Sequence, residues 1–135
     1  MGNSDKPHYF IKDGIAYVVY VGDETYEGLA DVHTRLAQDP AFYPEIPKLL
    51  DDRRVTDFAG PRVLMRIRDL VATFHVGAKR KRRIATVSAD RFAGSFAHIY
   101  RDLQESGPES GMVEGRIFET IEEAEAWLKE TLDKS

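Results

Sequence analysis

Cysteine is absent from the 135 residues of the sequence. Its absence excludes disulfide scaffolds, thiolate zinc sites and cysteine nucleophiles, and it is compatible with a reducing compartment. No stretch approaches the roughly 18 consecutive apolar residues that a transmembrane helix needs. The first ten residues, MGNSDKPHYF, lack the apolar core of a secretory signal peptide. We therefore expect a cytoplasmic protein with no transmembrane segment.

A strong excess of one charge sign is absent as well. The 19 lysines and arginines and the 23 aspartates and glutamates leave a formal net charge of −4. Domains dedicated to nucleic acids are usually basic, so we expect no specific nucleic-acid partner. The 42% of hydrophobic residues is typical of a soluble globular protein, and a chain of this length can bury a stable core without disulfides or a structural metal. We predict one domain over residues 1–135.

Short apolar runs alternate with amphipathic segments, which indicates alternating strands and helices. The runs IAYVVYV and IATVS are almost continuously apolar, as strands covered on both faces are, so we place both inside a sheet. Asp13-Gly14 suits a tight turn between the first two strands. The expected strands are residues 8–12, 15–22, 48–55, 84–88 and 113–119. The expected helices are residues 24–38, a helix that starts at Gly60-Pro61 and ends near Gly77, residues 91–105, and a final helix that opens with a capping box from Thr120 to Glu123.

The resulting order, ββαβαβαβα, predicts the α/β class. Strands linked by helices pair in parallel through right-handed crossovers. The expected architecture is therefore a single open, mostly parallel five-stranded sheet with about four helices. No internal repeat or linker divides the chain.

Three segments in this order carry a family resemblance: the strand ending in LLDDRRV, the run IATVS, and the C-terminal RIFETIEEAEAWL. They resemble the SpoIIAA-like proteins, which are relatives of STAS domains and, in fold, of CRAL-TRIO lipid-binding domains. The likeness covers roughly residues 8–130, and its most specific marks are Asp52-Arg53 and the tail from Phe118 to Leu128. The resemblance implies a small non-enzymatic module that is often dimeric.

In STAS anti-sigma-factor antagonists, a phosphorylatable serine lies near the start of the helix that follows such a strand. The corresponding segment here, VTDFAGPRV, has no serine, and Thr56 is its only hydroxyl. This departure from the family pattern argues against a phosphoswitch here, and whether Thr56 is phosphorylated is left open.

Polar residues follow the apolar start of the strand in LLDDRRV. In an open α/β sheet the carboxyl ends of strands face the edge where ligands bind, so Asp51 to Arg54 are expected there, just past the buried part. The simpler interpretation is a charge network in which one Arg–Asp pair fixes the loop. The functional interpretation is an anion or partner site at the start of the next helix. Its candidate residues are Arg54, Thr56, Asp57 and Gly60.

Five adjacent cations form the strongest local charge feature: Lys79, Arg80, Lys81, Arg82 and Arg83. They are interpreted either as a solvated loop and strand start, or as a basic patch that attracts phosphate, lipid headgroups or an acidic protein surface. No aromatic residue interleaves with them, so a stacking platform for single-stranded nucleic acid is not predicted.

Catalytic and metal-binding patterns are missing. The histidines at positions 8, 33, 75 and 98 are widely separated and form no His-x-x-x-His or Glu-x-x-His pair, so we predict no metal site and no cofactor. His33 falls on the apolar stripe of its helix and is expected to be a satisfied core residue. Ser88 and Ser95 lack the G-x-S-x-G elbow of a serine nucleophile. We assign no catalytic residue and do not expect an enzyme.

The proline-rich loop AFYPEIP holds Phe42 and Tyr43, which either cover the core or offer an apolar contact to a partner. We expect a non-catalytic module that acts by protein–protein interaction, including self-association as a homodimer. One alternative is a lipid or other apolar ligand, which the CRAL-TRIO relation suggests and an internal apolar cavity would favour. The other is an uncharacterised enzyme, which a cleft with a strongly perturbed acid or base would favour.

Overall fold

The protein is described here by a computed structural model that covers residues 5–88, 98 and 101–132. The strands are β1 (His8–Lys12), β2 (Ile15–Asp23), β3 (Lys48–Asp57), β4 (Arg82–Val87) and β5 (Val113–Phe118). The long helices are α1 (Tyr26–Ala37), α2 (Pro61–Phe74) and α4 (Ile121–Leu132), and residues 101–106 are helical too. Most of the helix expected over residues 91–105 lies outside the described residues.

The five strands form one sheet in the order β1-β2-β3-β4-β5. The first pair is antiparallel and the other three pairs are parallel, which confirms the α/β prediction. The β1–β2 turn is made by Asp13 (φ 54°) and Gly14 (φ 81°), because a two-residue hairpin turn of this kind needs positive φ at both positions. The run IAYVVYV lies in β2 and the first four residues of IATVS lie in β4, inside the sheet as predicted, and the two strands flank the middle strand β3.

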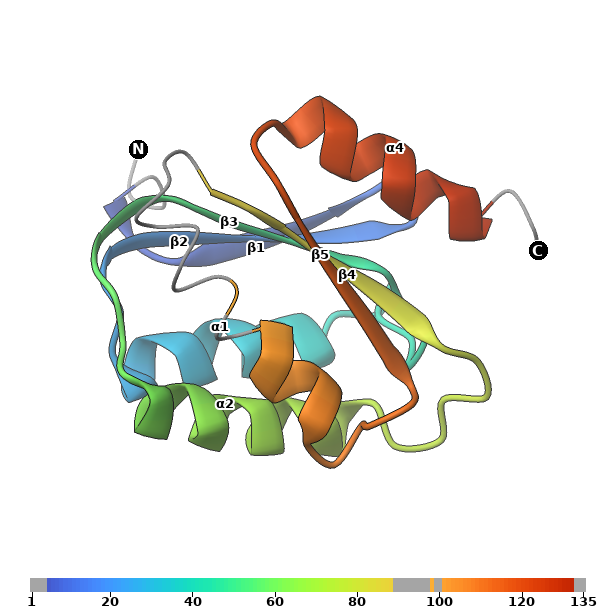
Figure 1. Ribbon diagram of the computed structural model, residues 1–135, viewed down its shortest axis with the longest axis horizontal. Coiled ribbons are helices and arrows are strands. Elements are labelled where there is room, and N and C mark those ends of the chain that lie inside the picture. The colour runs from blue at the N-terminus through green and yellow to red at the C-terminus, as the bar shows by residue number, and fades with distance from the viewer. Residues whose placement is uncertain (1–4, 89–97, 99–100, 133–135) are drawn as a thin grey trace.

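Helices cover both faces of the sheet (Figure 1). Helices α1 and α2 lie on one face, and α4 lies on the other, over β3, β4 and β5. Side chains alternate between the faces along a strand. In β2, Ala16, Val18 and Tyr20 pack in the core under α1 and α2, whereas Ile15 and Tyr17 pack in the smaller core with Trp127 of α4. This alternation explains why the β2 sequence is apolar at almost every position.

Two strands extend by two residues beyond their predicted bounds, and β2 extends by one. β3 continues beyond residue 55 because it pairs with β2 as far as Asp57, after irregularities in the register. β4 begins at Arg82 rather than at residue 84, because Arg82 and Arg83 pair with the first residues of β5. The last two cations of the basic run are thus strand residues, and their side chains point to opposite faces.

The helix starts follow the expected capping chemistry. α2 begins at Pro61 after Gly60, as predicted. At α4, the Glu123 N–H donates to Thr120 Oγ1 over 3.2 Å, and the Thr120 hydroxyl donates to the Glu123 carboxylate. α1 begins at Tyr26, two residues later than expected, because the Thr25 side chain caps it.

The loop aromatics Phe42 and Tyr43 are partly buried and pack against the α1–α2 core. Phe42 also meets the ring of His75 edge-on, with 5.2 Å between the ring centroids. Of the two interpretations of this loop, the one in which it covers the core is confirmed.

Candidate functional site

The predicted anion site lies at the end of β3 and the start of α2. Arg54, Thr56 and Asp57 are exposed, and Gly60 is the exposed N-cap of α2. The Thr56 hydroxyl donates to Asp23 over 3.1 Å. The structure therefore brings the four predicted residues into one exposed segment.

Carboxylates already occupy this segment, however. The Ala59 N–H, just before the helix, donates to Glu24 Oε1 over 3.1 Å. Burial raises the pKa of Glu24, while the bond from Ala59 opposes the shift. Asp23 and Asp57 pair across β2 and β3 beside it. Because negative charge repels an anion, these carboxylates weaken the interpretation of the segment as an anion site. The site stays a prediction.

The two acids of LLDDRRV are placed differently from the prediction. Asp51 and Asp52 do not lie past the buried part of β3, because both are buried, with exposures of 7% and 6%. Asp51 receives two bonds from the Arg53 guanidinium, each of 2.9 Å, which is the local Arg–Asp pair that the sequence suggested. Asp52 accepts a bond of 2.9 Å from the Ser88 hydroxyl. Asp52 therefore links β3 to the end of β4, whereas the Asp51–Arg53 pair lies within β3.

The basic run does not form one exposed patch. Lys79, Arg80 and Lys81 are exposed, as a solvated loop requires. Arg82 is buried and forms a two-pronged ion pair with Glu109, through bonds of 3.1 and 2.7 Å. Arg83 lies over the Trp127 ring, 4.5 Å from its centroid, and forms ion pairs with two glutamates. The interpretation as an exposed basic patch therefore does not apply to Arg82 and Arg83. Both lie at the start of β4 and pair with glutamates.

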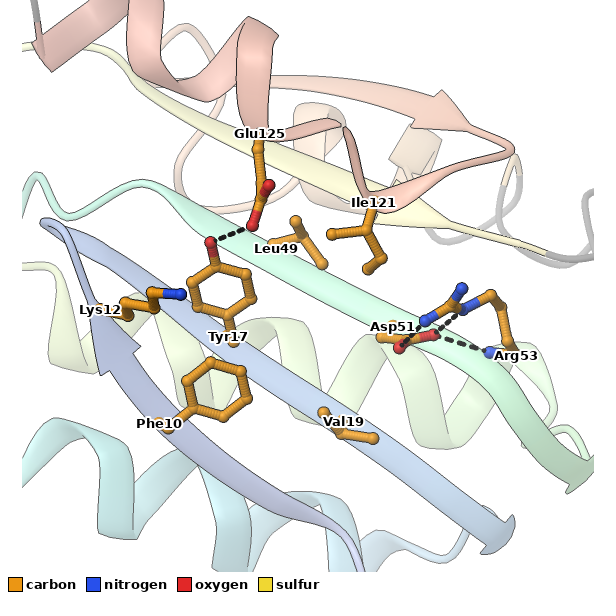
Figure 2. A pocket seen from close by; sticks show the side chains of 9 residues that line it. All are labelled: Phe10, Lys12, Tyr17, Val19, Leu49, Asp51, Arg53, Ile121 and Glu125. Atoms are coloured by element: carbon orange, nitrogen blue, oxygen red, sulfur yellow. Dashed lines mark hydrogen bonds and ion pairs between the residues drawn. The ribbon is translucent and has the colours of Figure 1, made fainter. Parts of the chain in front are cut away.

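An open groove lies on the α4 side of the sheet, over the strands that α4 leaves uncovered (Figure 2). Its apolar surface comes from β1, β2, β3 and the start of α4. Phe10 is 44% exposed and its ring stacks on Tyr17, with 4.5 Å between the centroids. The residues that line this α4-side groove are Phe10, Lys12, Tyr17, Val19, Leu49, Asp51, Arg53, Ile121 and Glu125.

Both signs of charge surround the apolar part of the groove. Lys12 and Arg53 supply cations, and Asp51 and Glu125 supply carboxylates. The Tyr17 hydroxyl donates to Glu125, and burial together with this carboxylate raises the pKa of the phenol. The groove therefore suits a partner that is apolar at its centre and charged at its margin.

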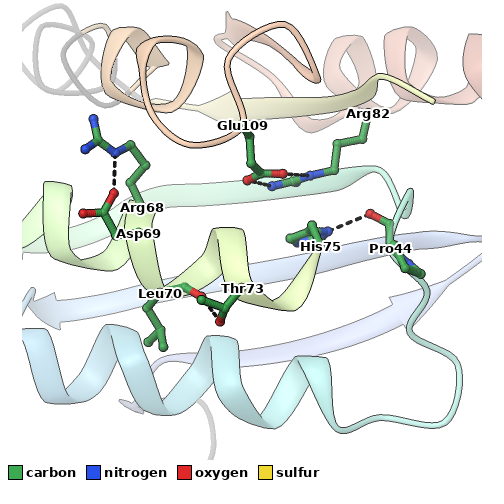
Figure 3. Close-up of polar contacts among 8 residues, drawn as sticks. All are labelled: Pro44, Arg68, Asp69, Leu70, Thr73, His75, Arg82 and Glu109. Atoms are coloured by element: carbon green, nitrogen blue, oxygen red, sulfur yellow. Dashed lines mark hydrogen bonds and ion pairs between the residues drawn. The ribbon is translucent and has the colours of Figure 1, made fainter. Parts of the chain in front are cut away.

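A buried polar cluster lies on the opposite face, between the sheet, α1 and α2, and Figure 3 shows three of its members, His75, Arg82 and Glu109. It consists of His33, Lys48, His75, Arg82 and Glu109, of which all but Glu109 are almost fully buried. The Tyr20 hydroxyl lies 2.8 Å from His33 Nε2, and His75 Nδ1 lies 2.7 Å from the Pro44 carbonyl oxygen. Burial is the main cause that lowers the pKa of both histidines, and the cations nearby lower it further.

Lys48 is the unusual member of the cluster. Burial lowers its pKa well below the ordinary value, and Arg82 adds to the effect, while Glu109 opposes it. A perturbed amine beside a cavity is a signal of catalysis in general. The cavity that Lys48 lines has room for roughly one water-sized particle, which is too small for an organic substrate.

Comparison with known proteins identifies the fold. No protein-family model matches the chain, and no curated protein gives a significant match. A solved structure, an uncharacterized protein of the DUF3478 family with a SpoIIAA-like fold from Shewanella loihica PV-4, aligns with a TM-score of 0.57 and 19% identity. The alignment covers 90% of this chain and 91% of that chain. The fold is SpoIIAA-like. The resemblance seen in the sequence is thereby confirmed for the architecture.

Two further observations concern the described part of this SpoIIAA-like fold. It contains no helix with the length and apolar character needed to cross a membrane. In the same residues, His, Asp and Glu side chains do not gather in groups of three that could hold a metal ion.

Sequence reasoning missed Phe10, Lys48 and Glu109. A period-two pattern in β1 places Phe10 and Lys12 on one face, which is the signal that could have found the groove. Lys48 precedes the apolar residues of β3, and its alternation with Leu50 directs it into the core. Glu109 comes from a loop 27 residues after its partner Arg82, and no local pattern links the two.

Proposed function

We propose that this chain is a non-catalytic binding module that acts by protein–protein interaction, and that its α4-side groove receives a second copy of the chain. The exposed Phe10 on the uncovered sheet face carries the proposal. Phe10 stacks on Tyr17 and still has 44% of its surface exposed. Covering this apolar surface with a partner lowers the free energy of the complex. Aromatic residues are enriched at such contacts.

Charge at the groove favours a second copy as the partner. A two-fold interface brings the same surface of both molecules together, so it has to be self-complementary. The groove margin carries cations, such as Lys12, and carboxylates, such as Glu125, around an apolar centre. In a two-fold pair, the cations of one copy can therefore meet the carboxylates of the other. A stable dimer of this kind buries more than about 1,000 Å² in total.

The dimer is tested by light scattering and native mass spectrometry at tens of micromolar protein. We expect a dimer for the parent chain and a monomer for Phe10→Asp, because the new carboxylate would be buried at the interface without a partner. Val76→Asp is the matched control, since Val76 is 77% exposed and lies after α2, away from the groove. The control variant should remain dimeric. A monomeric parent, or a Phe10→Asp chain that still dimerises, would contradict the proposal.

A second candidate is the binding of a small apolar ligand in the same groove. The groove volume of about 310 Å³ supports it, because small-ligand pockets begin near this size. Native mass spectrometry separates the two candidates. A mass increase of a few hundred daltons per chain, lost in Phe10→Asp, would favour the ligand, and a doubled mass without it favours the homodimer.

A further inference from the structure

The buried polar cluster contains polar atoms that the protein itself does not satisfy. Within the described residues, four buried side-chain nitrogens lack a hydrogen-bond partner, and three of them belong to this cluster. They are His33 Nδ1, His75 Nε2 and Arg82 Nη1. Buried polar groups in folded proteins are almost always hydrogen-bonded, so three unpaired nitrogens in one cluster need an explanation.

Two of the residues that carry these unpaired nitrogens, His33 and Arg82, line the same small cavity. His33, Lys48 and Arg82 line it together with Arg68 and Glu109. Arg82 has only 1% of its side chain exposed, so Nη1 cannot be satisfied by bulk water. When the Tyr20 hydroxyl donates to His33 Nε2, the imidazole proton is on Nδ1. Lys48, Arg82 and His33 then all present N–H donors.

The charges around the cavity do not balance. Arg82 is compensated by Glu109 at 2.7 Å. Arg68, which has 14% of its side chain exposed, is compensated by Asp69 at 3.0 Å. Among the ion pairs of the described residues, none involves Lys48. A buried cation without a counter-charge is costly, so either the amine loses its proton or a negative charge joins it.

We propose that this cavity is a binding site for a small monovalent anion of the size of chloride, held by Lys48, Arg82 and His33. The donors and the surplus positive charge select an anion over a cation. The room for roughly one water-sized particle excludes phosphate and sulfate, and it admits the somewhat larger chloride ion only with a small shift of the lining side chains. A water molecule would meet the donors but would leave a protonated Lys48 without a counter-charge.

The test compares chloride with gluconate, a monovalent anion too large for the cavity, as sodium salts at equal ionic strength. We expect the melting temperature to rise with chloride and then saturate, as it does for a ligand that binds only the folded state. Gluconate should give no such rise. The chloride-35 resonance should broaden in the presence of the protein, and crystals grown with bromide should show an anomalous peak beside Lys48.

Lys48→Met keeps the length of the side chain and removes its charge. The variant should fold and lose the chloride response, the line broadening and the bromide peak. Lys129→Met, which removes an exposed charge from α4, is the matched control and should keep all three. Should Lys48→Met fail to fold, the bromide peak and the line broadening of the parent chain still decide. A parent without a saturable chloride response and without a bromide peak would overturn the proposal in favour of water alone.

The pH dependence gives a second readout. The anion stabilises the protonated form of Lys48, so chloride affinity should fall as pH rises and this amine loses its proton. Among the described residues, the other charged or titratable groups that line the cavity are His33 from α1, Arg68 from α2, Arg82 from β4 and Glu109 from the loop before β5. The pH dependence should therefore disappear in Lys48→Met if Lys48 causes it. A chloride affinity that is the same across neutral and alkaline pH would contradict the role of Lys48.

Discussion

The pair of Arg82 and Glu109 gives the sharpest stability prediction, which concerns Glu109→Gln. The guanidinium is 1% exposed and binds the carboxylate through Nε and Nη2, at 3.1 and 2.7 Å. Glutamine keeps the size of the side chain and one acceptor oxygen, but it removes the negative charge. Arg82 then remains buried beside Lys48 without a counter-charge.

Breaking a buried ion pair from one side costs about 3–5 kcal/mol. We expect the lower end, about 3 kcal/mol, because 16% of the Glu109 side chain is exposed and the glutamine amide still accepts one bond. A domain of this size has a total stability of about 5–15 kcal/mol. The loss is therefore a large fraction of the total, and it should lower the melting temperature by about 10 °C.

Urea unfolding measures this loss of stability. The buffer contains gluconate in place of chloride, because chloride could compensate Arg82 where the Glu109 carboxylate is missing. Glu114→Gln is the matched control, because Glu114 is 39% exposed and its partner Arg83 also pairs with Glu130, so it should cost less than about 1 kcal/mol. Replacing Arg82 and Glu109 together by methionine should recover most of the stability, since no buried charge is left unpaired. A loss below about 1 kcal/mol in Glu109→Gln would refute the assignment of this pair as buried.

Two further predictions concern the exposed cations and the buried histidines. Changing Lys79, Arg80 and Lys81 to glutamine should reduce retention on anionic vesicles at low salt, where each cation contributes on the order of 1 kcal/mol, without changing thermal stability. A parent chain that is not retained at low salt would rule out this attraction. The folded state keeps His75 neutral because its pKa is lowered, whereas the unfolded chain takes up a proton below about pH 6.5. Stability should therefore fall as pH drops below this value, and His75→Gln should make the slope shallower by about 1.4 kcal/mol per pH unit in urea titrations between pH 4 and 6.

The architecture could be predicted because its signals are local. β2 and β4 carry almost continuously apolar runs, and a two-residue turn with Asp13 and Gly14 follows β1. Proline at the start of α2 and the Thr120 cap of α4 mark helix starts through the chemistry of the nearest residues. The strand ends were less predictable, because pairing with a neighbouring strand decides how far β3 and β4 extend.

The sites could be predicted only in part, because they depend on contacts between distant residues. The sequence shows five adjacent cations, but the start of β4 directs Arg82 inward to Glu109 and Arg83 toward Trp127. Alternation with Leu50 places Lys48 on the face of β3 that α1 and α2 cover, but its burial follows from the packing of these two helices. Long-range packing therefore decides which of these adjacent cations are exposed and which are buried.

The middle strand β3 connects the two proposed sites and also separates them. Side chains alternate along a strand, so Lys48 and Leu50 line the anion cavity, whereas Leu49, Asp51 and Arg53 line the α4-side groove. A shift of one residue in the register would exchange these two sets, and it would place Lys48 under α4 and Asp51 among the cations. Since neither site uses a side chain of the other, the dimer proposal and the anion proposal can fail independently.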